Sequence, residues 1–416
     1  MDRPNLHVYA ADQALRARAR AVIPGGMYGH QNAGRLPDGF PQFLERARGC
    51  RLFDVDGNEY IDFMCSYGPI ILGHGHPEVD AAAACQQALA DCQNGPSPRI
   101  VELAELLVDT IPHASWAMFE KNGTDATTKC VTIARAATGR RKILVASGSY
   151  HGSAPWCTPN LNGITSENRA HLIQFAYNDI ASVERAVDEA GDDLAGIIVT
   201  AFRHDNRVDQ ELPSPAFARR LRALCDARDA ALIIDDVRAG FRLHLGGSWE
   251  PLGVRPDLSA WSKAIANGYA LAAVLGNDRF REGATKIFAT GSFWFAATSM
   301  AAAIATVTIL REGKAIPAME RVGQMFRDGL AEQARSHGVR IRQSGPVQMP
   351  LLLFEDDPEF KKAVRFTGEA AKRGAYLHPW HNMFLSAAHR EADIRDALEI
   401  TDTAFAKVKQ EFGTAA

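Results

Sequence analysis

Two neighbouring aspartates stand at the end of a strongly apolar run in the segment ALIIDDVRAGFR, residues 231–242. The run is typical of a buried strand, so Asp235 and Asp236 would lie where that strand ends. A carboxylate in such a place is costly unless it caps a helix, forms a salt bridge or faces a cationic ligand. A protonated pyridine ring is a ligand of this kind, because a carboxylate beside its nitrogen helps the ring to accept electrons.

A lysine follows in the next apolar segment, DLSAWSKAIANGYA, residues 257–270. A lone lysine is usually a solvated surface residue. Lys263 has apolar and small neighbours, which favour a partly buried amine. Burial lowers the pKa of a lysine and makes its amine a nucleophile toward an aldehyde.

Two further segments suit a flat, phosphorylated cofactor. In FEKNGTDATTKC, residues 119–130, a strand runs through Asn122-Gly123-Thr124-Asp125 into a helix. Such a helix start is either an ordinary capped terminus or a phosphate seat, because its N–H groups are free and its dipole end is positive. In SGSYHG, residues 147–152, Tyr150 is either a core residue or a stacking partner for a ring. Together with Asp235 and Lys263, these segments predict a site for pyridoxal phosphate (PLP).

The elements that must position these residues alternate along the middle of the chain. Short apolar runs alternating with helical patterns predict an α/β lobe with a mainly parallel sheet, whose strand ends carry the chemistry. Both chain ends predict a smaller α+β lobe, with a turn at Asp56-Gly57. We expect a large PLP-binding domain over residues 66–314 and a small domain built from 1–65 and 315–416. The expected strands are 116–119, 142–147, 196–200, 231–235 and 270–276, and the expected helices include 124–139 and 213–230.

Composition limits the classes of protein that need to be considered. The formal charge of −3 over 416 residues offers no basic excess for nucleic acid. No run of about 18 apolar residues predicts a membrane span, and the N-terminal segment MDRPNLHVYAADQALRARAR lacks the apolar core of a signal peptide. The seven cysteines are odd in number and form no C-x-x-C pair, which disfavours a disulfide framework or a metal site. We therefore expect a cytoplasmic enzyme without a metal, a membrane or a nucleic-acid partner.

The segments FEKNGTDATTKCVTIARAATGRRKI, SGSYHG, IIDDVRAGFR and DLSAWSKAIANG resemble the class III aminotransferases. The most similar branch is the one nearest glutamate-1-semialdehyde aminomutase. The resemblance covers nearly the whole chain, including RARAVIPGGMYGH, SYGPIILGHGHP and LSAAHREADI. It implies PLP fold type I, with a mainly parallel seven-stranded sheet in the large lobe and a smaller α+β lobe from both termini.

The resemblance implies a cofactor role for each residue that matches the family. Lys263 would form the Schiff base with the aldehyde of PLP, and Asp235 would bind the pyridine nitrogen. Val237 would pack under the ring, and Tyr150 would stack on it.

The resemblance also implies how the phosphate is held. Gly123 and Thr124 would bind it from the start of the helix. The segment ATGSFWFAATSMAAA, residues 289–303, matches the part of the family that reaches the phosphate from a neighbouring subunit. Ser292 is the matching hydroxyl, so a homodimer with sites at its interface is implied.

Three departures from the aminomutase pattern concern the substrate. Ala201-Phe202 replaces a glutamate-proline pair, aromatic residues and alanines follow Ser292, and Ala266-Asn267-Gly268 replaces three glycines. These changes favour a transaminase with a more apolar substrate over an aminomutase.

Within the family, GGMYGH, WAMFEKNG, DDVRAGFR, TGSFWF and HNMFLSAAH are most similar to the branch that deaminates hydrolysed fumonisin. This similarity implies a long-chain amine without an alpha-carboxylate, such as an amino polyol, as donor and a keto acid such as pyruvate as acceptor. Arg203 or Arg238 would hold the keto-acid carboxylate, whereas either arginine would otherwise be a surface or ion-paired residue. Phe293 and Trp294 would line the pocket or, alternatively, fill the dimer interface. The candidate substrate residues are Tyr28, Tyr67, Arg203, Phe293, Trp294 and His381.

Three other functions remain as alternatives. An aminomutase would keep its amino group on one substrate and would not need pyruvate. A PLP-binding sensor without catalysis is disfavoured because Lys263 and Asp235 are both present. A hydrolase, an ATP enzyme or an NAD enzyme is disfavoured because no G-x-S-x-G, P-loop or G-x-G-x-x-G motif follows a strand.

Overall fold

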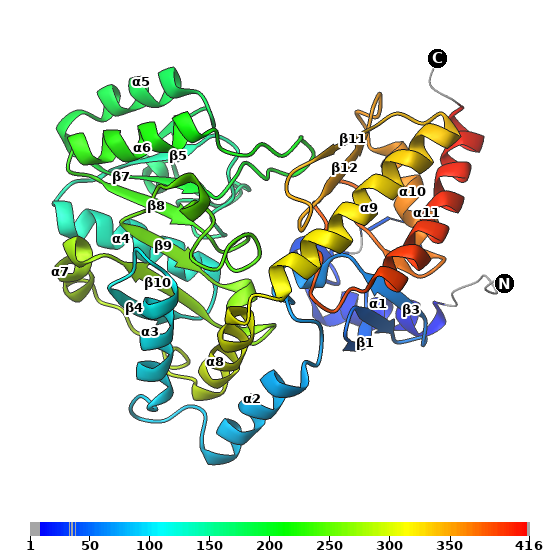
Figure 1. Cartoon of the computed structure of the whole chain (residues 1–416), viewed down its shortest axis with the longest axis horizontal. Coiled ribbons are helices and arrows are strands. Elements are labelled where there is room, and N and C mark those ends of the chain that lie inside the picture. The colour runs from blue at the N-terminus through cyan, green and yellow to red at the C-terminus, as the bar shows by residue number, and fades with distance from the viewer. Residues whose placement is uncertain (1–8, 33, 35, 38, 414–416) are drawn as a thin grey trace. The chain divides into compact units, whose positions relative to one another are not determined.

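The computed structural model describes residues 9–32, 34, 36–37 and 39–413 (Figure 1). The first eight residues, which entered the argument against a signal peptide, lie outside the described residues. The chain forms two compact units. The terminal unit comprises residues 1–76, 206–209 and 317–416, and the central unit comprises residues 77–205 and 210–316. The domain bounds expected from the sequence stay a prediction.

A seven-stranded sheet organises the central unit, in the order β4-β10-β9-β8-β7-β5-β6. β10 runs antiparallel to its neighbours β4 and β9, and the other neighbouring strands are parallel. The predicted α/β fold with a mostly parallel sheet is confirmed. The strands are β4 (Trp116–Glu120), β5 (Lys142–Ala146), β6 (Leu172–Phe175), β7 (Leu194–Thr200), β8 (Ala231–Asp235), β9 (Leu258–Trp261) and β10 (Ala272–Gly276).

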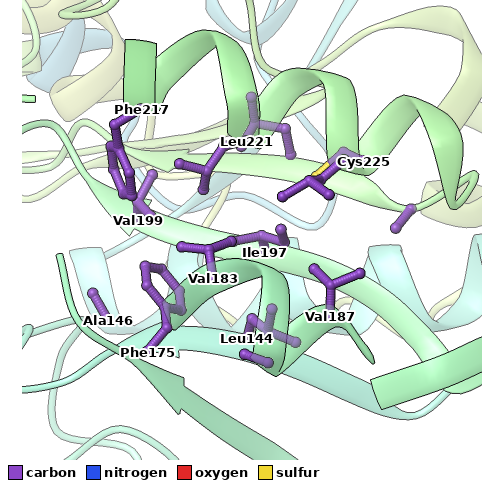
Figure 2. Close-up of a cluster of buried hydrophobic side chains, with 14 of the residues drawn as sticks. Leu144, Ala146, Phe175, Val183, Val187, Ile197, Val199, Phe217, Leu221 and Cys225 are labelled. Atoms are coloured by element: carbon purple, nitrogen blue, oxygen red, sulfur yellow. The ribbon is translucent and has the colours of Figure 1, made fainter. Parts of the chain in front are cut away.

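Successive residues of these strands enter two apolar cores, one on each face of the sheet. On one face, Leu144 of β5 shares a core with Val183 of α5 (Ile180–Ala190) and Leu221 of α6 (Pro215–Ala227), as Figure 2 shows. On the other face, the next residue, Val145, shares a core with Ile133 of α4 (Gly123–Thr138). Because helices cover both faces of the sheet, the strands are apolar along their length. Polar side chains that could take part in chemistry therefore lie at the strand ends.

The helices of the central unit begin and end at recognisable signals. The side chain of Asn122 accepts the N–H of Asp125 at 3.1 Å and caps α4, and Gly139 follows the last residue of this helix in the left-handed conformation. Ser214 caps α6 in the same way, with Pro215 in the first turn. The helices are α2 (Pro77–Leu89), α3 (Arg99–Thr110), α4 (Gly123–Thr138), α5 (Ile180–Ala190), α6 (Pro215–Ala227), α7 (Asp278–Lys286) and α8 (Ala297–Arg311).

The terminal unit combines the two ends of the chain. Its four-stranded sheet has the order β1-β2-β3-β13, so a strand from the C-terminal half pairs with the N-terminal strands. The predicted turn at Asp56-Gly57 joins β2 to β3, with Gly57 at φ 84°. The strands are β1 (Leu44–Arg48), β2 (Arg51–Asp54), β3 (Glu59–Asp62), β11 (Ile341–Ser344), β12 (Leu351–Phe354) and β13 (Ala375–Tyr376). The helices of the terminal segments are α1 (Ala10–Val22), α9 (Ala315–His337), α10 (Lys361–Ala371) and α11 (Glu391–Phe412).

Among the helices of the described residues, none is long and apolar enough to cross a membrane.

Candidate active site

Four of the residues selected from the sequence follow strands that run in one direction. Gly123 follows β4, Tyr150 follows β5, Asp235 ends β8 and Lys263 follows β9. The carboxyl ends of these strands share one edge of the sheet, since β4 and β9 are both antiparallel to β10 and the others are parallel to β9. This edge is where ligands bind in open α/β sheets.

Asp235 is a buried carboxylate with two protein contacts. Its side chain is at most a few per cent exposed, and its Cα pairs with that of Ala260 in the sheet, close to Lys263 in the sequence. Oδ1 accepts the backbone N–H of Val237 at 3.1 Å, and Oδ2 lies 2.7 Å from Nδ1 of His151. A carboxylate has about four lone-pair sites, so these two contacts leave acceptor capacity for a ligand.

The neighbouring Asp236 has a different partner. Its carboxylate accepts the backbone N–H of Ser248 at 3.2 Å and also contacts the Ser248 hydroxyl. Burial raises the pKa of Asp236 to about 7, against the lowering effect of the two Ser248 hydrogen bonds. The two carboxylates therefore differ in their partners. Asp236 is bonded to Ser248, whereas Asp235 is bonded to His151 and to the backbone N–H of Val237.

Lys263 begins a short turn directly after β9, in the left-handed conformation with φ 47°. A lysine in this conformation is uncommon, and such strain is most often found at functional sites. Burial, together with the positive charges of Arg238 and Arg242, lowers the pKa of Lys263 to about 7, although the negative charge of Asp235 opposes this shift. Near neutral pH a large share of this amine is uncharged and nucleophilic.

The start of α4 packs closely against the end of β8. A Cβ at Gly123 would lie 2.6 Å from Cγ1 of Val237, so a side chain here would force the two segments apart. The Thr124 hydroxyl accepts the backbone N–H of Ser153 at 3.1 Å. The N–H groups and the positive dipole end of α4 are thereby held beside Val237, near the β8 strand end.

Tyr150, Arg203 and Arg238 follow the carboxyl ends of β5, β7 and β8, respectively. Tyr150 is 38% exposed, and burial raises its pKa. Arg238 is buried and donates from Nη1 to the carbonyl of His204 at 3.2 Å. Burial lowers the pKa of Arg238 to about 10, so it remains charged at neutral pH. Arg203 forms an ion pair with Glu211 at 2.9 Å, in which both side chains are about one-third exposed.

Three candidate substrate residues belong to the terminal unit. Tyr67 is in the left-handed conformation with φ 62°, and its ring meets that of His381 edge to face, 5.2 Å apart. Tyr28 is 73% exposed. The structure thus brings Tyr67 and His381 together.

The aromatic segment after α7 belongs to the central unit. Ser292 and Phe293 are exposed, with Phe293 at 67%. Trp294 stacks on Phe295 with 4.6 Å between the ring centroids. This segment offers aromatic surface to solvent or to a partner.

The model of the class III aminotransferases matches residues 35–405, most of the chain. The chain belongs to the class III aminotransferases. This membership confirms the predicted enzyme class and fold type, and the protein is a PLP-dependent aminotransferase.

Relatives of this class III aminotransferase include both transaminases and aminomutases. It is 48% identical over 400 residues to the aminopentol aminotransferase of Sphingopyxis macrogoltabida, covering 96% of this chain and 95% of that one. The solved PLP internal aldimine form of the Sphingopyxis sp. MTA144 FumI protein has a TM-score of 0.96 at 47% identity, covering 97% and 98% of the two chains. The glutamate-1-semialdehyde 2,1-aminomutase of Anaeromyxobacter sp. (strain Fw109-5) is 33% identical over 423 residues, covering 95% and 98%.

The residues at the sheet edge of this aminotransferase fit PLP. The glycine start of α4 suits the phosphate, the acceptor capacity of Asp235 suits a cationic ring nitrogen, and the depressed pKa of Lys263 suits bonding to an aldehyde. All three lie in the central unit.

One contact of the aminotransferase site was not predicted from the sequence. His151 follows Tyr150 in the SGSYHG segment, yet only the tyrosine was assigned a role. The 2.7 Å contact between His151 and Asp235 joins residues that are 84 positions apart. The only signal for this contact in the sequence is a histidine after a strand, and such a histidine is as typical of a structural residue as of a functional one.

Proposed function

We propose that this aminotransferase moves the amino group of a long-chain amine, one without an alpha-carboxylate, to a keto acid such as pyruvate. The observation that carries the proposal is the 48% identity, over almost the full chain, to an aminopentol aminotransferase. The aromatic segment from Phe293 to Phe295 supports it, since aromatic side chains bury apolar ligand surface well. An amino polyol like that in the fumonisin branch is the expected type of donor.

In this proposal, PLP is held from several directions by the central unit. Gly123 and Thr124 bind the phosphate, Asp235 binds the ring nitrogen, and Lys263 binds the aldehyde. Val237 would pack under the ring and Tyr150 would stack on it. The packing of Gly123 on Val237 supports a common site for these residues.

The chemistry then depends mainly on Lys263 and Asp235. When bound, PLP supplies an aldehyde carbon and a ring that accepts electrons. The substrate amine would take the place of Lys263 on the aldehyde carbon. The freed Lys263 Nζ, in its uncharged form, would then remove a proton from the amine-bearing carbon of the substrate and later return it, as a general base and acid. Asp235 stabilises the positive charge of the ring nitrogen throughout. The same residues act in the reverse direction when the amino group passes to the keto acid.

The substrate itself would contact residues beyond the cofactor. Arg203 is proposed to hold the keto-acid carboxylate, with Arg238 as the other candidate. The partial exposure of Arg203 and the retained charge of Arg238 support these roles. The proposed pocket residues are Tyr28, Tyr67, Phe293, Trp294 and His381.

A comparison of amine donors tests the substrate class. Long-chain 2-amines and amino polyols with pyruvate are expected to exceed glutamate, ornithine and 4-aminobutyrate in kcat/KM by about tenfold or more. Burying only two extra methylene groups contributes about 1.6 kcal/mol, which is already a factor of more than ten. Alanine formed per minute is the measurement. If a dicarboxylic or diamino donor exceeds every long-chain amine, the proposed substrate is wrong and the enzyme class stands.

The same assay separates transamination from an aminomutase reaction. Glutamate 1-semialdehyde should give no product in the absence of a keto acid, whereas an aminomutase would convert it without pyruvate. Phe293→Ala supplies a matched variant: it should lower kcat/KM for a long-chain amine and leave that for a short amine nearly unchanged. Equal losses for both amines would place Phe293 outside the pocket.

We also propose that the enzyme is a homodimer. Several large apolar side chains of the central unit are exposed, as expected for a surface covered by a second copy. Ser292 of one copy would then reach the phosphate bound to the other. Among these side chains are Leu89, Val101 and Phe288, with Phe288 the most exposed of them at 87%.

Weakening this surface should reduce both association and PLP binding. Phe288→Ser is expected to shift the protein toward monomer in sedimentation and to lower activity at dilution in parallel. Ser292→Ala should keep the dimer and raise the PLP dissociation constant about 2- to 13-fold, as one lost hydrogen bond of 0.5–1.5 kcal/mol predicts. Leu212→Ser, at another exposed apolar residue, is the control. Fully active monomers would contradict the proposal.

A cytoplasmic location is proposed as well. It is supported by the cysteines, all seven of which are free thiols in the described chain, as is usual for proteins in a reducing compartment.

A further inference from the structure

The loop after β7 begins at the edge of the sheet that carries the proposed PLP site. Its first residues are fixed by hydrogen bonds. The indole N–H of Trp249 donates to the carbonyl of Ala201 at 2.8 Å, and two backbone hydrogen bonds, of 2.8 and 3.0 Å, join Arg203 to Glu211. Because the backbone is held at these points, the side chain of the next residue, His204, has a defined place in the central unit.

His204 is a buried histidine with a ring nitrogen that lacks a partner. The residue is 4% exposed, and its Nδ1 has no hydrogen-bond partner among the described residues. Its ring meets that of Phe202 edge to face, with 5.2 Å between the centroids, and its backbone carbonyl accepts Nη1 of Arg238 at 3.2 Å. A buried polar atom without a partner is rare in proteins, and a ligand or an ordered water usually accounts for it.

The imidazole of His204 lies close to the lysine of the proposed site. Burial, together with the positive charges of Arg238 and Lys263, lowers the pKa of His204 well below its ordinary value. Because electrostatic interactions weaken with distance, His204 and Lys263 are near neighbours, and the amine-bearing carbon of a substrate must reach Lys263. The imidazole is uncharged at neutral pH, so its Nδ1 is either a donor or an acceptor, depending on the tautomer.

The next residue, Asp205, has a second polar atom of the same kind. Its Oδ1 is buried and has no hydrogen-bond partner in the part of the chain that the structure describes. A Cβ at Gly148, in the segment after β5, would lie 2.8 Å from Oδ2 of Asp205, so the carboxyl group lies against the backbone of that segment. Arg238 and His151 interact electrostatically with both Asp205 and His204, which shows that the two side chains share their surroundings.

We propose that His204 and Asp205 form a subsite for hydroxyl groups that the amine donor carries close to its amine-bearing carbon. A hydroxyl group can donate to Oδ1 of Asp205, and it can either donate to Nδ1 of His204 or accept from it. The inference rests on the proposed transfer from an amine without an alpha-carboxylate, and it names a second group of that amine. Donors of this kind are 1,2- and 1,3-amino alcohols.

Other chemical groups fit these two residues less well. A carboxylate would face the carboxyl group of Asp205, and a second ammonium group would face the positive charges of Arg238 and Lys263. An apolar group would leave the buried polar atoms unpaired, which is destabilising. A site that is built to bond a hydroxyl group therefore discriminates strongly against the analogue that lacks it.

A matched pair of short donors tests the subsite independently of chain length. With the wild-type holoenzyme and pyruvate, 3-amino-2-butanol is expected to exceed 2-aminobutane in kcat/KM by about tenfold or more, as the pairing of a buried polar group predicts. His204→Leu removes both ring nitrogens at similar volume, and it should reduce this preference to within about threefold. Asp205→Asn keeps one acceptor oxygen and should reduce the preference less.

His113→Leu is the matched control, because His113 is also a buried histidine but has a partner, the hydroxyl of Ser259 at 2.8 Å. It should leave the preference for the amino alcohol unchanged. Urea unfolding of the apoproteins gives a second readout. His113→Leu should lower the urea midpoint because it breaks the bond to Ser259, whereas His204→Leu should not, since Nδ1 of His204 has no such bond to lose.

The outcomes also separate this inference from the proposed function. If the wild type does not prefer the amino alcohol, or if His204→Leu keeps the preference, the subsite is wrong and the proposed long-chain donor stands. If 2,3-diaminobutane exceeds the amino alcohol, the two residues bind a cation and the proposal is wrong. A weaker affinity for PLP in His204→Leu with an unchanged preference would place His204 against the cofactor and overturn the proposal. If long-chain amines are poor donors while the short amino alcohol keeps its preference, the proposed chain length is wrong and the subsite stands.

Discussion

Replacing Lys263 with methionine is expected to lower kcat by about four orders of magnitude or more and to make the apoprotein more stable. Activity falls because the variant has neither an amine to bind the aldehyde of PLP nor a base to move the substrate proton. Alanine formation from pyruvate measures this loss. Borohydride reduction followed by digestion should label the wild type at Lys263, and a label on any other lysine would contradict the assignment.

The gain in stability follows from the pKa of the same lysine. Its pKa is about 7 in the folded protein, whereas an unfolded chain has a lysine pKa of about 10.4. Below pH 7 the full cost of burying the charged amine is present, and it is lost progressively as the pH rises toward 10. The free energy of unfolding of the wild-type apoprotein should therefore rise with pH through this window.

Methionine carries no charge, so the variant avoids this cost. Its apoprotein should be more stable than the wild type by on the order of 4 kcal/mol at pH 6.5, but by only about 1 kcal/mol at pH 9.5. Urea unfolding at the two pH values measures the difference. Lys314→Met is the control, because Lys314 is fully exposed, and it should change neither activity nor this pH dependence. A pH-independent gain would show that the pKa of Lys263 is ordinary.

The strands that carry the site could be predicted because they are buried on both faces. β8 occupies the expected residues 231–235, and α4 begins one residue before the expected start at 124. Continuous apolar runs and a cap followed by glycine are local signals, and the tertiary structure did not override them. These signals placed Gly123, Asp235 and Lys263 at strand ends.

Strands at the edge of a sheet gave weaker signals. β6, Leu172–Phe175, lies at the edge of the central sheet and was not predicted, since it is short and exposes Gln174. β1 has the polar sequence LERAR and is mostly exposed, so its pairing with β2 defines it as a strand. An edge strand of this kind has no apolar run by which to recognise it.

The finer chemistry of the site depends on contacts between distant residues. No local pattern distinguishes Asp235 from its neighbour Asp236 without the family resemblance, whereas their partners, His151 and Ser248, distinguish them in the structure. The left-handed backbone of Lys263 was not predicted either, because lysine has no preference for it. Strain of this kind is held by the surrounding structure.

Replacing Asp235 with asparagine is expected to lower kcat at least about 100-fold while PLP remains bound. Removing the charge that faces a buried cation costs on the order of 3 kcal/mol or more, which corresponds to that factor in rate. The amide keeps the size of the carboxylate, so Val237 and the phosphate seat should stay in place. The measurements are single-turnover rates with an amine donor, together with PLP content from absorbance.

Asp236→Asn provides the matched control at the adjacent residue. Asp236 is equally buried, but its raised pKa of about 7 means that it holds a proton for much of the time near neutral pH. An amide imitates that protonated carboxyl group, and Ser248 remains able to bond to it. Asp236→Asn should therefore retain activity within about threefold, since at most a few tenths of a kcal/mol are at stake. If both variants lost activity equally, the loss would result from disturbing the end of β8, and the charge of Asp235 would have no special role.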